Sequence, residues 1–372
     1  MDTAGGTVRR PRATRRWTVA AVCLAAGSLA LAACGSSSSG SSGGSTSGKV
    51  GVSLILKTLS NPYFVSMEKD AKTEAAKDNV NLTVAAGKED GDTQTQISAI
   101  DNAISRGDKG ILITENGNAV NTELAKARQA GLYVIALDTV PTPPSTVDIT
   151  YGTDNEAAGK LIGQYAAAKL NGGKAVVAML DLFNNQVVSV DIQRDHGFLE
   201  GMGISPGSTS LNGKEAKTGK YTGGKGDYVI ACHQPTTGAI PGGKTAMENC
   251  LSANPNINVV YTINEPAADG AHQALQAAGK NNVMIMTIDG SCNYVNGLLK
   301  DGTIAADSAQ YPGKMASIGV KTLASIARGG AKPTLPAGKD FINTGTALIT
   351  ANPVPGIDSQ TPEKAASACW GS

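Results

Sequence analysis

Short apolar runs alternate with amphipathic stretches along this chain from Lys49 onward, and this alternation constrains its fold more than any other feature. The first run, Val50–Leu56, carries no charge, as expected for a parallel strand that is buried on both faces. Pro62 cannot continue such a strand, but it fits the first turn of a helix that has Asn61 as its N-cap. Repetition of this strand–helix unit predicts an α/β fold with doubly wound parallel sheets.

The pattern occurs in two similar halves, which predicts two lobes with a cleft between them. In the first half, the predicted strands are Val50–Leu56, Asn81–Ala86, Gly110–Thr114, Tyr133–Leu137 and Ile149–Tyr151, and the predicted helices are Pro62–Lys77, Thr93–Arg106 and Ala119–Ala130. In the second half, the predicted helices are Glu156–Leu170, Val187–Glu200, Thr245–Ala253, Ala267–Ala278 and Tyr294–Lys300, and the predicted strands are Ala175–Leu180, Tyr228–Cys232, Val259–Ile263 and Val283–Ile288.

Residues 1–33 have the features of an export signal. An arginine cluster precedes the apolar stretch Val19–Ala33, which is short for a membrane span of about 20 residues. The stretch ends in Leu31-Ala32-Ala33-Cys34, which resembles the lipobox of bacterial lipoproteins, with Cys34 as the lipidated residue. A plain signal peptide with an incidental cysteine is the alternative. Residues 34–48 are mostly Ser and Gly and predict a flexible tether. We therefore expect an extracytoplasmic protein that is lipid-anchored to the outer face of the cytoplasmic membrane.

Four cysteines remain in the body, an even number that suggests two disulfides in an oxidising compartment. Four cysteines allow three pairings. We favour Cys232 with Cys250, which are close in sequence, and Cys292 with Cys369, which would tie down the C-terminal tail. A zinc site is the alternative, but the spacings contain no CxxC unit.

The charge balance argues against a nucleic-acid partner. The chain has 32 Lys and Arg against 31 Asp and Glu, and its body contains no basic stripe. We expect a monomer that needs no cofactor and no metal ion.

Four short polar residues directly follow predicted strands: Asn61, Asp138, Asn264 and Asp289. Because open α/β sheets bind ligands at the carboxyl ends of their strands, these side chains predict a binding site for hydroxyl groups. Each residue could instead serve only as a helix N-cap.

Three further residues point to the same edge of the fold. Tyr63 and Phe64 beside Asn61 suit a sugar, because the amide meets hydroxyls and the rings face the apolar C–H surface. The alternative places both rings in the core. Arg194 would reach the cleft as a rigid fork of donors, unless it is a surface residue paired with a neighbouring aspartate.

Two other functions compete with binding. Residues Gly238–Thr245 satisfy the phosphate-loop expression GxxxxGK[ST], but the preceding predicted strand ends well before them and Pro241 lies inside the motif. Asp138 and Asp289 are a possible carboxylate pair for an exported glycosidase. A binding cleft uses the same residue types without catalysis, so we expect a binding protein rather than an enzyme.

From Lys49 to its end, the chain resembles the periplasmic sugar-binding proteins of the ribose/fructose type that feed ABC transporters. The motifs that carry this resemblance are Thr58–Val65, Val134–Asp138, Arg194-x-x-Gly197-Phe198, Asn264–Ala268, Ile288–Gly290 and Ala309–Pro312. Three stretches are most similar to the fructose-binding branch, namely Tyr261–Ala268, Ala246–Asn249 and Cys369-Trp370-Gly371.

The resemblance implies a type I periplasmic-binding-protein fold whose two lobes are joined by a three-crossing hinge, with a membrane permease as partner. The lobes would comprise residues 49–153 plus 311–348 and residues 154–310 plus 349–372. The residues implied to bind sugar hydroxyls are Asn61, Asp138, Arg194, Asn264, Asp289 and Gln310, with Tyr63 and Phe64 as the aromatic face and Asp191 and His233 as additional candidates.

Fructose is the expected ligand. Relatives in the ribose branch have an arginine where this sequence has Thr139, and an aromatic residue in the region of His233-Gln234, where this sequence has none. These two differences make a pentose the less favoured ligand.

Overall fold

The computed structural model describes residues 48–221 and 225–371. Within them, six parallel strands form the first sheet, in the order β12-β5-β4-β3-β1-β2. These strands are β1 (Val50–Leu56), β2 (Val80–Ala86), β3 (Gly110–Ile113), β4 (Tyr133–Leu137), β5 (Ile149–Gly152) and β12 (Ile342–Asn343).

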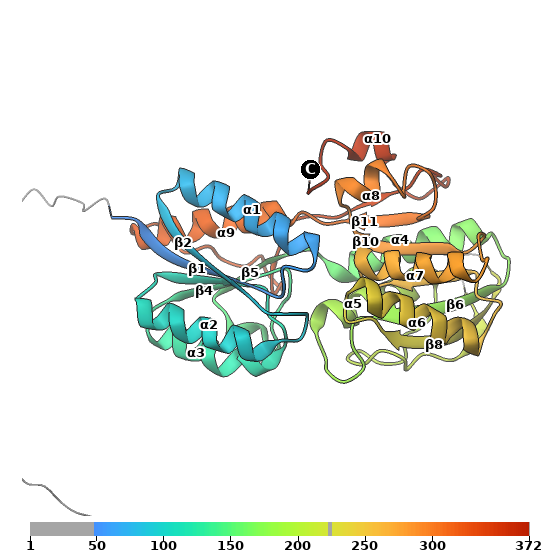
Figure 1. Cartoon of the computed structure of the whole chain (residues 1–372), viewed down its shortest axis with the longest axis horizontal. Coiled ribbons are helices and arrows are strands. Elements are labelled where there is room, and N and C mark those ends of the chain that lie inside the picture. Colours follow the sequence, from blue (N-terminus) through green and yellow to red (C-terminus); the bar gives the residue numbers. More distant parts are fainter. Residues whose placement is uncertain (1–47, 222–224, 372) are drawn as a thin grey trace, which may run out of the picture. The chain divides into compact units, whose positions relative to one another are not determined.

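Two pairs of helices cover the first sheet. One face carries α1 (Pro62–Lys77) and α9 (Pro312–Ala327), and the other carries α2 (Thr93–Arg106) and α3 (Asn121–Gln129) (Figure 1). Apolar side chains on alternate faces of the strands pack against each helix pair, as the charge-free strand sequences require. Two short 3₁₀ helices lie in the connections, at Asn118–Val120 and Pro144–Thr146.

The second sheet has seven strands among the described residues, in the order β13-β11-β10-β9-β6-β8-β7. The two edge strands β13 and β7 run antiparallel to their neighbours. The strands are β6 (Ala175–Asp181), β7 (Thr218–Lys220), β8 (Asp227–Pro235), β9 (Val259–Thr262), β10 (Met284–Asp289), β11 (Ala306–Ala309) and β13 (Ala347–Ile349). The helices are α4 (Asn155–Leu170) and α5 (Ser189–Met202) on one face, α6 (Ile240–Ala253) and α7 (Glu265–Ala277) on the other, and the short α8 (Cys292–Asn296) and α10 (Pro362–Ala365).

The predicted α/β class with doubly wound parallel sheets is confirmed, and most predicted elements lie within a few residues of those observed. Six elements, β7, β11, α9, β12, β13 and α10, have no counterpart in the sequence prediction. β13 pairs with β11, so Ala347 and Leu348 lie in the second sheet, just before the predicted lobe boundary at residue 348. The lobe boundaries themselves stay a prediction.

The phosphate-loop interpretation of Gly238–Thr245 is wrong, because these residues do not form a loop between a strand and a helix. Helix α6 begins at Ile240, inside the motif, and Lys244 is exposed on its surface. A Cβ atom on Gly243 would overlap the carbonyl oxygen of Ala267 in α7. This glycine therefore allows two helices to pack closely and does not cradle a phosphate.

From Gly48 onward the chain forms one compact unit. The predicted signal peptide, the lipidation site Cys34 and all of the predicted tether except Gly48 lie outside the described residues. None of the helices in residues 48–221 and 225–371 has the length and apolarity that crossing a membrane requires.

Both predicted disulfides are present. Cys232 of β8 is joined to Cys250 of α6, and Cys292 at the start of α8 is joined to Cys369 in the C-terminal tail. The first bond links neighbouring elements of the second sheet. The second fixes the tail beside the end of β10, since the backbone of Trp370 also accepts a hydrogen bond from the Cys292 amide.

Glycines bring helices α4 and α5 into backbone contact. A Cβ atom on Gly159 would overlap the carbonyl oxygen of Arg194, and one on Gly197 would overlap that of Glu156.

We expect Gly197→Ala to lower the free energy of unfolding by roughly 2–3 kcal/mol, because the packed backbones cannot separate without moving α5. Urea unfolding measures this loss. Glu200→Ala, at an exposed position of the same helix, should change stability by less than about 0.5 kcal/mol. Equal losses in the two variants would contradict this account of the packing.

Candidate functional site

Eight of the ten predicted ligand-binding residues line one cavity, which has a volume of about 30 Å³. They come from the segments at the carboxyl ends of strands in both sheets, from the first turn of helix α1 and from helix α5. The residues are Asn61, Tyr63, Phe64, Asp138, Arg194, Asn264, Asp289 and Gln310. The prediction that parallel strand ends would gather these side chains in one place is therefore correct in geometry.

The structure adds five residues that the sequence analysis missed. Lys57, Asp90, Leu182, Val190 and Ile263 also line the cavity. Lys57 directly follows β1, so its position at a strand end was a usable signal. Asp90 lies in the loop after β2 and carried no signal beyond its charge.

Asp191 and His233, the two additional candidates, do not line this cavity. The Asp191 carboxylate accepts hydrogen bonds from the backbone N–H groups of Leu182 and Phe183. The His233 ring lies between the carboxylates of Asp181 and Glu215, 2.7 Å and 2.8 Å from its two nitrogens. Both side chains are thus held by groups outside the cavity.

Asp138 is the centre of the first-sheet side of the cavity. Its carboxylate accepts hydrogen bonds from the hydroxyls of Tyr63, at 3.1 Å, and Thr139, at 3.0 Å. The Nζ atom of Lys57 lies 3.5 Å from Oδ2 of Asp138. Asp138 is 3% exposed, so these donors compensate a charge that is almost completely removed from water. The Tyr63 hydroxyl therefore uses its proton in the hydrogen bond to Asp138.

Arg194 reaches the cavity from the other side. Its Nε donates to Oδ1 of Asn155 at 2.7 Å and its Nη1 donates to the carbonyl oxygen of Ile263 at 2.8 Å. Its Nη2 lies 3.9 Å from Oδ1 of Asp138. These bonds fix the plane of the guanidinium and leave N–H groups directed toward the cavity. The alternative of a surface arginine paired with a neighbouring aspartate is therefore wrong.

Asp289 and Gln310 form a buried polar pair. Gln310 Nε2 donates to Oδ1 of Asp289 at 3.0 Å, and the backbone N–H of Glu265 donates to Oδ2 at 3.3 Å. Burial raises the pKa of Asp289 to about 8, with Arg194 opposing the rise and Asp307 adding to it. Within the described part of the chain, Gln310 Oε1 is buried and has no hydrogen-bond partner. This oxygen can accept a hydrogen bond from a ligand hydroxyl.

Asn61 and Asn264 are both helix N-caps and cavity residues, which are the two roles that the sequence left open. Asn61 Oδ1 accepts from the Tyr63 amide and caps α1, and Asn264 Oδ1 accepts from the Ala267 amide and caps α7. Both side chains also line the cavity. Capping fixes each amide group in place, which prepares it for a ligand without a further cost in side-chain entropy.

Aromatic residues close the back of the cavity. The rings of Tyr63 and Phe64 meet edge to face at 5.3 Å, and the ring of Trp370 meets Tyr63 in the same way at 5.5 Å. Trp370 Nε1 donates to the backbone oxygen of Asp289 at 2.7 Å. The C-terminal tail thus packs against helix α1 and against the end of strand β10.

The cavity is rich in charge for its size. Lys57 and Arg194 face three carboxyl groups, those of Asp90, Asp138 and Asp289. Burial raises the pKa of Asp90 to about 6, opposed chiefly by Lys57. Ligand pockets usually measure about 300–1,000 Å³, so a cavity of about 30 Å³ requires movement of its walls before a ligand can bind.

Comparisons with known proteins agree with this geometry. A family model described as "Periplasmic binding protein domain" matches residues 52–331. The ribose import binding protein RbsB of Escherichia coli (strain K12) is 28% identical to this chain over 279 residues, which cover 75% of this chain and 85% of that protein. The D-allose-binding periplasmic protein of the same organism is 25% identical over 306 residues, covering 80% and 91%.

Solved structures share the fold. An ABC transporter periplasmic solute binding protein from Actinobacillus succinogenes 130z, with bound D-allose, has a TM-score of 0.67 and 24% identity, and the match covers 81% of this chain and 98% of that one.

Proposed function

Because this chain belongs to the periplasmic binding protein domain family, we propose that it captures a monosaccharide in the cavity described above and delivers it to an ABC transporter permease. Family membership confirms the expected type I periplasmic-binding-protein fold and the expectation of a binding protein rather than an enzyme. The glycosidase alternative for Asp138 and Asp289 is accordingly set aside.

The arrangement of donors and acceptors in the cavity carries the proposal. Amide groups, a fixed guanidinium and carboxylates converge from both sheets, and hydroxyl groups of a sugar can both donate to and accept from such a set. Oε1 of Gln310 is the clearest example, because it has no hydrogen-bond donor within the described residues. A buried acceptor without a donor lowers the free energy of unfolding. A polyhydroxylated ligand would supply the missing donor.

Fructose is the first candidate for the sugar, on the strength of the motifs shared with the fructose-binding branch. The similar proteins described above carry ribose and D-allose in their names, so both sugars are direct competitors. Thr139 donates to Asp138 within the protein, and it has no charge to offer a pentose in the way that an arginine would.

Delivery to a permease would use motion between the two sheets. We place the three crossings of the hinge near Thr153, near Gln310 and near the segment that enters β13. Separation of the sheets would open the small cavity to a sugar, and closure would bury it and present both faces to the permease. The lipid anchor at Cys34 and the monomeric state stay predictions.

A thermal-shift panel on the chain from Gly48 onward tests the proposal. The panel contains fructose, ribose, D-allose, mannose, glucose, galactose, arabinose, polyols and ATP. A ligand at about 100 times its Kd adds roughly 2.7 kcal/mol of stability, so a true ligand gives a clear rise in Tm.

We expect a rise with fructose or a close relative and none with ATP. A rise with ribose or D-allose alone would keep the transporter function and overturn the choice of fructose. Absence of a rise in Tm with every sugar would overturn the monosaccharide proposal.

A further inference from the structure

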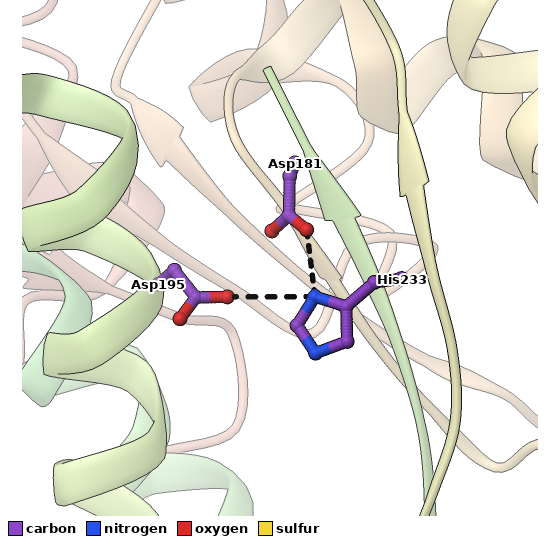
Figure 2. A group of neighbouring side chains, drawn as sticks. All are labelled: Asp181, Asp195 and His233. Carbon is purple, nitrogen blue, oxygen red and sulfur yellow. Dashed lines mark hydrogen bonds and ion pairs between the residues drawn. The ribbon is translucent and has the colours of Figure 1, made fainter. Parts of the chain in front are cut away.

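A second cluster of polar side chains lies in the lobe of the second sheet, outside the cavity. Figure 2 shows the carboxylates of Asp181 and Asp195 directed at the Nδ1 atom of His233. Oδ2 of Asp181 lies 2.7 Å from Nδ1, and Oδ2 of Asp195 lies 3.9 Å from it. The three residues come from β6, α5 and β8, so three separate elements fix their positions.

The spacing of these atoms is close to that of a metal coordination shell. One carboxylate oxygen from each aspartate and one nitrogen of the histidine all lie within 4.8 Å of one another. Ligand atoms that share one Zn²⁺ at about 2.1 Å lie no more than about 4.2 Å apart. For all three to share one ion, the Asp181 oxygen would move away from Nδ1 and the Asp195 oxygen would move toward it.

A fourth residue orients the imidazole. Nε2 of His233 lies 2.8 Å from Oε1 of Glu215, whose side chain is 3% exposed. In the metal-free protein, the 2.7 Å contact places a proton between Nδ1 and Asp181, and a metal ion would take the place of this proton while Nε2 keeps the proton that it donates to Glu215. Metal-bound histidines typically have such a carboxylate on their other nitrogen, which fixes the tautomer and strengthens the ligand.

The cluster also contains buried acceptors that no described residue satisfies. Both carboxylate oxygens of Asp195 and Oδ1 of Asp181 lack a hydrogen-bond partner within the described part of the chain, and the Asp195 side chain is 0% exposed. A buried carboxylate aimed at an imidazole nitrogen with no donor of its own is the arrangement that a cation satisfies.

The charges point in the same direction. Three carboxyl groups, those of Asp181, Asp195 and Glu215, lie beside a single imidazole. One proton on Nδ1 offsets only one of these potential negative charges, whereas a divalent ion in the same place offsets two.

We infer that Asp181, Asp195 and His233 form a binding site for a divalent transition-metal ion such as Zn²⁺ or Mn²⁺, with Glu215 as the residue that positions the imidazole. One imidazole and two carboxylates suit these ions, whereas Ca²⁺ takes six to eight oxygen ligands and Mg²⁺ binds mainly to oxygens and water. The His233 side chain is 22% exposed, which leaves water access to the remaining coordination positions.

The site would brace one wall of the cavity. Asp195 is adjacent in sequence to Arg194, and Asp181 is adjacent to Leu182, and both of these neighbours line the cavity. The ion would therefore join β6, β8 and α5 directly behind the residues that contact a ligand. This role does not depend on which ligand the cavity takes.

Isothermal titration of the untagged chain from Gly48 onward tests the site, after dialysis against EDTA and then against metal-free buffer. ZnCl₂ and MnCl₂ are the probes, and CaCl₂ and MgCl₂ are the comparisons. We expect one Zn²⁺ or Mn²⁺ per chain, and at least 10-fold weaker binding of Ca²⁺ and Mg²⁺.

Variants locate the bound ion. Asp195→Asn and His233→Gln should each weaken binding at least 100-fold, and Glu215→Gln should weaken it about 10- to 100-fold, as for other residues that orient a metal ligand. His272→Gln is the matched control, because His272 lies on α7, outside the cluster, and is partly exposed. It should bind like the parent chain.

Absence of stoichiometric Zn²⁺ and Mn²⁺ binding to the parent chain would overturn the site. Binding that Asp195→Asn and His233→Gln leave unchanged would overturn it as well, because the ion would then lie elsewhere. His233→Gln keeps the test decisive if Asp195→Asn fails to fold, since His233 is partly exposed.

Discussion

Replacement of Asp289 by alanine is expected to weaken sugar binding at least about 100-fold. Each carboxylate oxygen of Asp289 already accepts one hydrogen bond from the protein, which leaves one lone pair on each for a sugar hydroxyl. Burial favours the neutral acid in the ligand-free protein, and donation from two sugar hydroxyls favours the ionised carboxylate. Hydrogen bonds to a charged group contribute about 1.5–3 kcal/mol each, so the loss of two amounts to roughly 3 kcal/mol. Isothermal titration with the sugar identified by the thermal-shift panel measures the change.

The fold should survive this substitution. Burial raises the pKa of Asp289 to about 8, above its ordinary value, so the folded protein favours the neutral acid and gains no stability from the ionised side chain. Alanine leaves Gln310 and the Glu265 amide without their acceptor, at a cost of about 1–3 kcal/mol. Asp340→Ala, at an exposed position, is the control and should leave both affinity and stability unchanged. Binding of the sugar by Asp289→Ala within threefold of the parent affinity would contradict the site.

Local sequence rules were sufficient for the part of the site that follows buried strands. Val50–Leu56 is charge-free and Pro62 follows it, so the end of β1 and the start of α1 could be predicted to the residue. Asn61 caps the helix as expected. Because parallel strands end at the same edge, residues far apart in sequence could then be placed together without knowledge of their contacts.

Strand β11 shows why other elements could not be predicted. Its four residues include Asp307 and Ser308, which are buried and polar and break the apolar pattern of a central strand. Asp307 accepts from the amides of Asp289 and Gly290, and Ser308 donates to the carbonyl oxygen of Ala158. Only these distant partners make such a strand stable inside the protein, and the local sequence does not reveal them.

The direction of the His233 side chain depends on an irregularity in strand pairing. The pairing of β6 with β8 shifts by one residue between Val177 and Ala178, where Ile230 is followed in register by Cys232. A shift of one residue moves every later side chain to the opposite face of the strand. The sequence carries no mark of this irregularity, so the direction of His233 became clear only from the structure.

The disulfide between Cys292 and Cys369 is expected to contribute more to stability than the one between Cys232 and Cys250. The two bonds span 77 and 18 residues. Loop-closure entropy then gives about 4.5 kcal/mol for the first and about 3 kcal/mol for the second. Urea unfolding of the Cys292→Ala/Cys369→Ala and Cys232→Ala/Cys250→Ala double variants measures the two losses, and alanine avoids the burial of a hydroxyl group.

The two disulfides should also differ in their effect on sugar affinity. Removal of Cys369 frees Trp370, which packs on Tyr63 and donates to the backbone oxygen of Asp289, so the ring and the strand end that line the cavity lose a shared support. We therefore expect Cys292→Ala/Cys369→Ala to bind sugar about 10-fold more weakly. Cys232→Ala/Cys250→Ala should keep the parent affinity, because neither cysteine is adjacent in sequence to a residue that lines the cavity or, like Trp370, packs on a residue that does. Equal sugar affinities in the two double variants would mean that the tail stabilises the fold without supporting the site.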